Sequence, residues 1–343
     1  MVTESIERGA NREDLESAFV LLRRQVIDAG LLDRTYGHYA WSGLLWFAFL
    51  IMSTIAGVRV PELGLVAAAM IAIATVQIGL LGHDAGHRAV FGSSALNVIL
   101  GTLCWSLVLG IGFAYWNQRH LQHHANVNDV RSDPDLQWIG ALAARRNSAH
   151  GRRGWLRRLS QSIEGPAYSL GLAFRFRVDG WQYALQRLRG SRRGLELVLL
   201  GISLTLWLLP CLLVGPRWLL TYVAAQVLGG VYLGAAIAPN HKGMATWTAG
   251  ASPGFVERQV LSARNVRPSL LVDLVLGGLN YQIEHHLFPN MSRARLGQAR
   301  ILVRQFCAEQ GLPYQERSLL ASYRIVLSEL QRFSREDASQ TSC

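Results

Sequence analysis

The sequence is poor in lysine, cysteine and charge, and each shortage narrows the class of protein. Lys242 is the only lysine among 34 basic residues, and charged residues make up 17% of the chain. The four cysteines lie far apart without a C-x-x-C pair, so we expect them to be reduced and to form no disulfides. The first 35 residues lack the apolar core of a secretory signal. The net charge is +11, but the arginines flank apolar segments, which argues against a nucleic-acid-binding protein.

Long apolar stretches, in contrast, are abundant. Half of the 343 residues are hydrophobic and the mean hydropathy is positive, which favours an integral membrane protein over a soluble one. A helix needs about 20 mostly apolar residues to span a bilayer. Four stretches meet that length: residues 39–57, 63–81, 195–214 and 218–238. Short turns join the first stretch to the second and the third to the fourth, which predicts two helical hairpins.

The basic residues predict the direction of these hairpins. The two turns contain only Arg59 and Arg217, and the other 32 of the 34 basic residues lie elsewhere in the chain. Basic residues near the ends of spans favour the cytoplasmic side of a membrane. We therefore expect both hairpins to open toward the cytoplasm, with the rest of the chain on that face.

Eight of the ten histidines fall in four short clusters around the spans. They are His83 and His87; His120, His123 and His124; His241; and His285 and His286. Histidines three or four residues apart on a helix share one face, which brings their rings toward the same point. One such cluster is weak evidence of a metal site. Several clusters that follow spans on one face predict a single site with more than one metal ion.

Residues 96–115 form a fifth apolar stretch that is long enough to span. If it crossed the membrane, His83 and His87 would lie on the opposite face from His120 and would share no metal ion with it. We therefore predict that the stretch folds back as a re-entrant or interfacial hairpin. Three glycines offer possible bends: Gly101, Gly110 and Gly112. A fifth span is the alternative, and it would exclude a single shared site.

Eight imidazoles exceed what one tetrahedral zinc ion binds, so the pattern predicts two metal ions with an open position. Nitrogen-rich ligation suits zinc, copper, iron or nickel, and spacing alone does not choose among them. Gln282, three residues before His285, is able to offer its amide oxygen as a further ligand. His38 and His150 lie outside the clusters, and we assign them no chemistry.

Histidine ligands need hydrogen-bond partners that fix the orientation of their rings. Polar residues close to the clusters are the candidates: Asp84, Asp129, Asp133, Asp135, Asn240, Asp273, Asn280 and Glu284. We expect these side chains to orient the rings from outside the set of metal ligands.

The N-terminal residues 1–37 predict an amphipathic helix. Leu15, Phe19, Leu22 and Val26 repeat at helical spacing beside charged residues. Because the protein is expected in a membrane, we interpret this helix as lying on the cytoplasmic membrane surface.

The C-terminal part predicts a helical cap over the site. Residues 292–333 are expected to form two amphipathic helices, and the polar residues 334–343 a flexible tail. Residues 38–291 would form the membrane and histidine core. We therefore predict that residues 1–343 form a single all-α integral membrane domain. It would have four transmembrane helices in two hairpins and a cytoplasmic helical cap carrying a di-metal site.

The clusters read H-x-x-x-H, H-x-x-H-H and Q-x-x-H-H, present here as HDAGH, HLQHH and QIEHH. With the strings APNHKGM (238–244) and GLNYQIEHHLFPNMSR (278–293), residues 38–333 resemble the membrane fatty acid desaturase family. The branch is the one whose third box begins with glutamine, as in front-end and bacterial acyl desaturases. The resemblance implies that the eight clustered histidines bind two iron ions, His241 being the extra ligand after the fourth span. Gln282 stands where many relatives have a ninth histidine, which leaves its role as a metal ligand open.

The resemblance also implies an activity and partners. An oxidoreductase of this family uses O2 and two electrons to introduce a C=C bond into a fatty acyl chain, carried by CoA, acyl-carrier protein or a glycerolipid. About 38 residues precede the first span and no histidine is followed by proline, so we expect a separate electron donor, such as ferredoxin or a haem protein with its reductase. The expected location is a bacterial cell membrane, in contact with membrane lipid, with the active site on the cytoplasmic face. Arginines at 145–158 and 187–193 suit an acidic headgroup, a carrier phosphate, an acidic ferredoxin or anionic lipid.

Two alternatives remain open from the sequence. The same di-iron scaffold supports hydroxylation, epoxidation or acetylenic bond formation, and the boxes do not separate these reactions. A non-redox membrane zinc hydrolase or metal-handling protein belongs to a different class. A transporter would place its ligands at the middle of the bilayer, whereas these histidines lie at the ends of spans.

Overall fold

The computed structural model describes residues 12–136, 154–248 and 253–340. By its internal contacts the chain divides into two compact units. Residues 34–120 and 159–236 form the first, called here the membrane unit. Residues before 34, residues 121–158 and residues from 237 onward form the second, called here the C-terminal unit.

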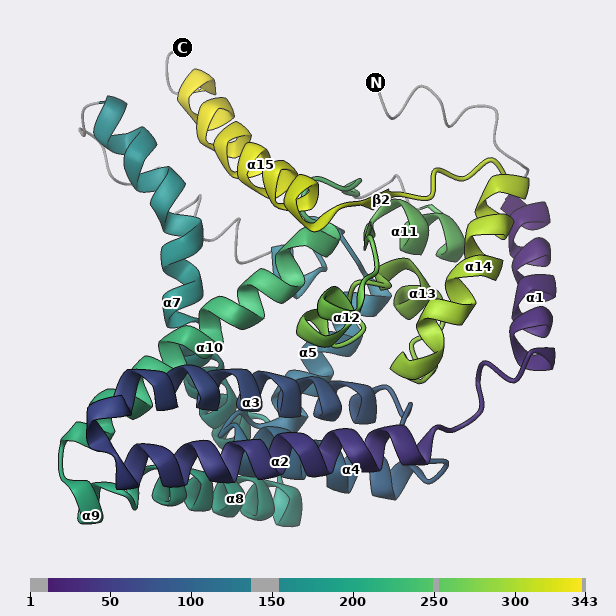
Figure 1. The fold of residues 1–343 in the computed structure, drawn as a ribbon. Coiled ribbons are helices and arrows are strands. Elements are labelled where there is room, and N and C mark those ends of the chain that lie inside the picture. The colour runs from purple at the N-terminus through teal and green to yellow at the C-terminus, as the bar shows by residue number, and fades with distance from the viewer. Residues whose placement is uncertain (1–11, 137–153, 249–252, 341–343) are drawn as a thin grey trace. The chain divides into compact units, whose positions relative to one another are not determined.

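The membrane unit contains the long apolar helices (Figure 1). Its elements are α2 (Tyr36–Arg59), a 3-10 turn (Pro61–Leu63), α3 (Gly64–Gly86), α4 (Ser94–Thr102), a π-helix (Leu103–Val108), α5 (Phe113–Ala125), α7 (Gly154–Gln186), α8 (Gly190–Leu208), α9 (Cys211–Val214) and α10 (Arg217–His241). One end of each of the helices α5, α7 and α10 belongs to the C-terminal unit. Within the described ranges, four helical segments are long and apolar enough to cross a membrane: 36–59, 64–86, 190–214 and 217–241. The prediction of an integral membrane protein with four spans is confirmed.

Helix α3 is the central helix of the membrane unit. In its most apolar window 61% of the residues are buried, against 11% for α2. The two helices lie side by side (Figure 1), and Gly57 of α2 leaves the space that Ala67 of α3 occupies. The outer face of α2, which includes Trp41 and Leu44, stays exposed. An apolar exposed face of this kind is what contact with lipid requires.

The apolar stretch at residues 96–115 is broken. Helix α4 continues into the π-helix, and after a tight turn the chain leaves along α5 at an angle of 115°. Gly110, one of the predicted bends, lies in this turn with φ +67°, which side chains other than glycine rarely adopt. Glu196 of α8 stabilises the turn, because it accepts a hydrogen bond from the hydroxyl of Ser106 (2.9 Å). The same hydroxyl accepts one from the N–H of Phe113 at the start of α5 (2.9 Å).

The broken stretch returns to the place where it started. The Nε2 atoms of His87, at the end of α3, and His120, on α5, lie 2.8 Å apart. The stretch therefore begins and ends at the same end of α3, which agrees with the predicted fold-back.

The C-terminal unit consists of short helices and one pair of strands. Its elements are α1 (Arg12–Asp28), α11 (Phe255–Leu261), β1 (Asn265–Val266), α12 (Leu270–Leu276), α13 (Gln282–Leu287), α14 (Arg293–Glu309), β2 (Glu316–Arg317) and α15 (Leu319–Gln340). Strands β1 and β2 pair in parallel, Asn265 opposite Glu316. The regular structure of the described residues is otherwise helical, so the all-α prediction is confirmed.

One expectation about this unit is wrong. The apolar stripe of α1 does not lie on the membrane surface: Leu22 and Val26 are buried in a core with residues of α11, α13 and α14, and Phe19 stacks on Phe288 at 5.5 Å. An amphipathic stripe fits a protein core as well as a membrane, and here protein covers it. Residues 334–340, part of the expected flexible tail, continue helix α15 as far as Gln340.

The packing of α1 leads to a prediction with an adjacent control. Leu22 is 2% exposed and Leu21 is 60% exposed on the same helix. Leu22→Ala is expected to destabilise the protein by about 2–5 kcal/mol because it removes buried apolar surface and leaves a cavity. Leu21→Ala should change stability little. Thermal unfolding of both variants in detergent measures the difference, and equal unfolding midpoints would contradict a buried α1.

Candidate metal centre

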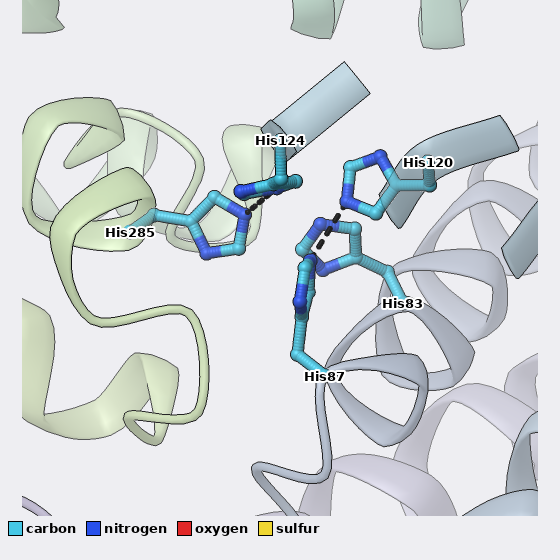
Figure 2. A group of neighbouring side chains, drawn as sticks. All are labelled: His83, His87, His120, His124 and His285. Carbon is cyan, nitrogen blue, oxygen red and sulfur yellow. Dashed lines mark hydrogen bonds between the residues drawn. The ribbon is translucent and has the colours of Figure 1, made fainter. Parts of the chain in front are cut away.

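The membrane unit brings three histidines together at the end of α3. His83 is on the last turn of α3, His87 follows that helix, and His120 is on α5. One ring nitrogen from each lies within 4.8 Å of the others. Figure 2 shows the rings of His87 and His120 facing each other, with their Nε2 atoms 2.8 Å apart. These three residues are called here the first histidine group.

Neighbouring side chains fix the rings of this group. The Nδ1–H of His83 donates to Asp84 (2.9 Å), and Asp84 also accepts a hydrogen bond from Tyr39 of α2 (2.8 Å). The indole of Trp116 stacks on His120, with centroids 4.7 Å apart. Trp105 of the π-helix stacks in turn on Trp116, at 4.1 Å. Trp105 belongs to the broken apolar stretch, so this stretch contributes to the aromatic packing behind the histidines.

The C-terminal unit contains a second group of three histidines, which come from α5, α10 and α13. They are His123, His241 and His286, called here the second histidine group, and one ring nitrogen from each lies within 4.8 Å of the others. The Nε2 atoms of His241 and His286 are 3.2 Å apart. All three residues are buried.

Each ring of the second group donates its Nδ1–H to an acceptor. His123 donates to the carboxylate of Asp133 (3.0 Å), and Asp133 is fully buried. His241 donates to the backbone carbonyl of Ser262 (2.8 Å). His286 donates to the side-chain oxygen of Gln259 (2.9 Å). In all three residues the Nε2 atom is left with its lone pair, as a metal ligand requires.

The remaining two clustered histidines form a pair within the C-terminal unit. His124 of α5 and His285 of α13 point their Nε2 atoms at each other across 3.1 Å (Figure 2). His285 and His286 are adjacent on α13, and their ring planes differ by 85°. The third box therefore directs one ring toward His124 and the other toward His241.

The residues fit a metal ion by their chemistry and spacing. Three pairs of Nε2 atoms lie 2.8, 3.1 and 3.2 Å apart. Nitrogen ligands about 2.0–2.1 Å from a shared ion lie roughly 3 Å from one another. Neutral imidazole is a ligand that iron, zinc and copper accept. The arrangement thus suits metal binding by all eight histidines, while the identity of the metal stays a prediction.

Gln282 lies beside the second histidine group. Its side-chain oxygen accepts a hydrogen bond from Asn240 (3.1 Å), and its side-chain nitrogen lies 2.9 Å from Nε2 of His241. The amide therefore reaches the position that a further ligand would take. Whether it binds metal stays a prediction.

Some of the polar residues that the sequence suggested as ring partners bond elsewhere. Asp129 accepts from the backbone N–H groups of Arg131 and Ser132. Asn280 donates to Asp273 (2.7 Å). Neither of these bonds involves a histidine. Of the suggested carboxylates, Asp84 and Asp133 contact histidine rings most closely, and Asp135 lies 3.6 Å from the ring of His123.

Glu284, between the ligands of the third box, is also turned away from the rings. It accepts hydrogen bonds from Asn265 (2.7 Å) and from the hydroxyl of Tyr314 (2.7 Å). Complete burial raises the pKa of Glu284. These bonds attach α13 to β1 and to the chain just before β2.

Sequence reasoning missed Gln259, Ser262, Arg264 and Asn265, all of which are buried. They lie about 20 residues before the third box, outside any histidine cluster. The only signal was a run of polar residues between two apolar segments. His150 and the arginines at 145–153 lie outside the described residues, and His38 is exposed on α2.

Known proteins resemble this chain over most of its length. The family described as "Fatty acid desaturase" matches residues 60–318. An acyl-lipid (9-3)-desaturase of Physcomitrium patens is 29% identical over 302 residues, which cover 80% of this chain and 54% of that protein. A delta 8-(E)-sphingolipid desaturase of Kluyveromyces lactis is 25% identical, over 97% of this chain and 62% of that protein. A delta(5) fatty acid desaturase of Caenorhabditis elegans is 25% identical, over 95% and 76%. The chain thus spans less than two thirds of the length of the first two.

The hydrogen bond between His123 and Asp133 leads to a prediction. Asp133→Asn is expected to lower metal affinity about 10–100-fold, because the ring loses the carboxylate that orients it and strengthens it as a ligand. Asp129→Asn is the matched control, since Asp129 bonds backbone N–H groups in the same loop. Metal titration of both variants measures the effect. Equal affinities in the two variants would contradict a role for Asp133 at the ring.

Proposed function

The chain belongs to the fatty acid desaturase family, and from that premise we propose that it is an integral membrane acyl-chain desaturase that binds two iron ions. The observation that carries the proposal is the arrangement of the rings. His83, His123, His241 and His286 each donate an Nδ1–H to an acceptor of the protein, and the Nε2 atoms converge in groups. Such rings are prepared for metal ions rather than for proton transfer with solvent.

Helix α5 supports a single site with two ions. It carries His120 of the first group and, one turn later, His123 of the second group and His124. These residues share one helix face by their spacing, and on that ground we propose, as the sequence predicts, that the two groups serve one centre. In the proposed centre, His124 and His285 would supply two further ligands. The amide of Gln282, beside His241, would be a candidate for another.

When bound, the two iron ions supply the O2 activation that removal of two hydrogens from unactivated methylenes requires. The chain's own residues have three tasks. The histidines would hold the ions, and the hydrogen-bond acceptors of the rings keep the rings from turning. The stacked Trp105 and Trp116 exclude water from the side of the first group. An acyl chain offers no polar handle near its methylenes, so its depth in an apolar environment has to select the carbon atoms that react.

The names of the relatives support the substrate class. They act on acyl lipids, sphingolipids or fatty acids, and we propose a fatty acyl chain in a lipid environment for this chain. The cytoplasmic face, a bacterial membrane and a separate electron donor are parts of the proposal. Exposed Arg187, Arg189 and Arg192 at the α7–α8 junction are candidates for an acidic headgroup or an acidic donor.

Expression with a compatible reductase tests the proposal. His120→Ala and His285→Ala are each expected to abolish the unsaturated product while the protein still inserts in the membrane, because each removes a ligand. His38→Ala is the control, since His38 is exposed and lies outside the ligand groups. The measurement is mass analysis with double-bond mapping of lipid and thioester pools. Product in either ligand variant would contradict the assignment of that histidine.

The product also separates the alternatives. Loss of two hydrogens supports desaturation, whereas gain of one oxygen would show hydroxylation or epoxidation on the same scaffold. Two zinc ions and no iron in a fully active protein would support the hydrolase instead.

A further inference from the structure

A short segment of the C-terminal unit, residues 259–265, contacts every helix of that unit that carries a ligand. It runs from the last turn of α11 to the start of β1 and is buried along its whole length. Its contacts reach α5, α10 and α13, which carry the second histidine group. No histidine lies within the segment.

Gln259 joins two of these helices through one side chain. Its oxygen accepts the Nδ1–H of His286 on α13 (2.9 Å), and its nitrogen donates to the backbone carbonyl of His124 on α5 (3.1 Å). The side chain is fixed at both ends, and the residue is 2% exposed. The acceptor is a neutral amide, so His286 keeps a fixed tautomer without a carboxylate beside it.

Arg264 holds the end of the third helix, α10. Its guanidinium donates to the backbone carbonyls of Pro239 (3.0 Å from Nε) and Lys242 (3.0 Å), and its own N–H donates to the carbonyl of Asn240 (2.8 Å). The last carbonyls of a helix have no partner within the helix and carry partial negative charge, which a buried guanidinium satisfies. His241 lies among these residues, and Ser262 accepts its Nδ1–H.

Asn265 completes the segment by holding the backbone of α13. Its side-chain oxygen accepts the N–H of Ile283 (2.9 Å) and its side-chain nitrogen donates to Glu284 (2.7 Å). The third box is therefore attached at its first turn by Asn265 and at its ring by Gln259.

We propose that residues 259–265 form a positioning segment for the second metal ion, in which Gln259 fixes the ring of His286 and Arg264 fixes the helix end that carries His241. The inference rests on the proposed function for the presence of two ions. It adds that one ion depends on this segment more than the other. Gln259 supports a ring of the second group, whereas the first group has its own supports in Asp84 and Trp116.

Two substitutions at Gln259 separate its two hydrogen bonds. Gln259→Met has a similar length and makes neither bond. Gln259→Glu keeps an acceptor for His286 but loses the donor to the carbonyl of His124. Gln298→Met, at an exposed position of α14, is the matched control. Arg264→Met tests the helix end.

Three quantities are measured on the whole 343-residue chain: the metal ions bound per chain, the midpoint potential of the bound iron, and the thermal unfolding temperature. The wild type and Gln298→Met are expected to bind two ions. Gln259→Met and Arg264→Met should retain about one ion per chain. With metal bound, each variant should unfold at a temperature no lower than that of the metal-free wild type, which would show that the variant still folds. Gln259→Glu should retain both ions and shift the midpoint potential to more negative values, because a carboxylate acceptor makes the ring a stronger donor to oxidised metal.

Two results would overturn the inference: two ions at an unchanged potential in Gln259→Met, or loss of both ions together with unfolding. If the wild type binds two zinc ions and no iron, that result would refute the proposed iron enzyme but not the role of residues 259–265. The comparison of ions per chain would still decide the role of the segment with zinc as the probe.

Discussion

A histidine ring has two nitrogens, and it presents one of them to a metal ion in a fixed direction when a hydrogen-bond acceptor holds the other. This requirement governs how the clustered histidines are supported here. Four rings are held in this way, by two carboxylates, one backbone carbonyl and one amide. None of the acceptors of the second group lies on the same helix as its histidine. The fold has to bring loops and helix ends together before the rings of the second group point correctly.

The two units meet this constraint by different means. In the membrane unit an apolar environment leaves few polar partners, so His83 uses the adjacent Asp84, which Tyr39 holds, and stacked indoles limit the movement of His120. In the C-terminal unit a dense set of buried polar groups bond one another, and a buried polar group is stable only when it is hydrogen-bonded. The end of α10 is an example. The backbone carbonyls of Pro239 and Lys242 accept hydrogen bonds from the buried guanidinium of Arg264.

The sequence predicted those features that local patterns encode. Hydropathy located the four spans, because that signal lies within one helix. The histidine clusters, and the place of His241 after the fourth span, pointed to the eight rings that the structure places in two groups of three and one pair. The sequence did not locate Gln259 or Arg264, whose bonds reach residues 27 and 25 positions away, and a backbone acceptor such as the carbonyl of Ser262 leaves no residue-specific signal. The apolar stripe of α1 was expected on the membrane surface but packs in a protein core, because contact with protein and contact with lipid require the same apolar pattern. The bend near Gly110 was foreseen, but its support from Glu196 was not.

The proposed function requires that the clustered histidines bind two iron ions as one nitrogen-ligated centre. X-ray absorption at the iron edge, combined with elemental analysis of the purified protein, tests it most directly. About two iron ions per chain are expected, with nitrogen or oxygen neighbours at roughly 2 Å and no sulfur ligand. A single ion per chain, sulfur neighbours, or an active protein that contains only zinc would contradict it.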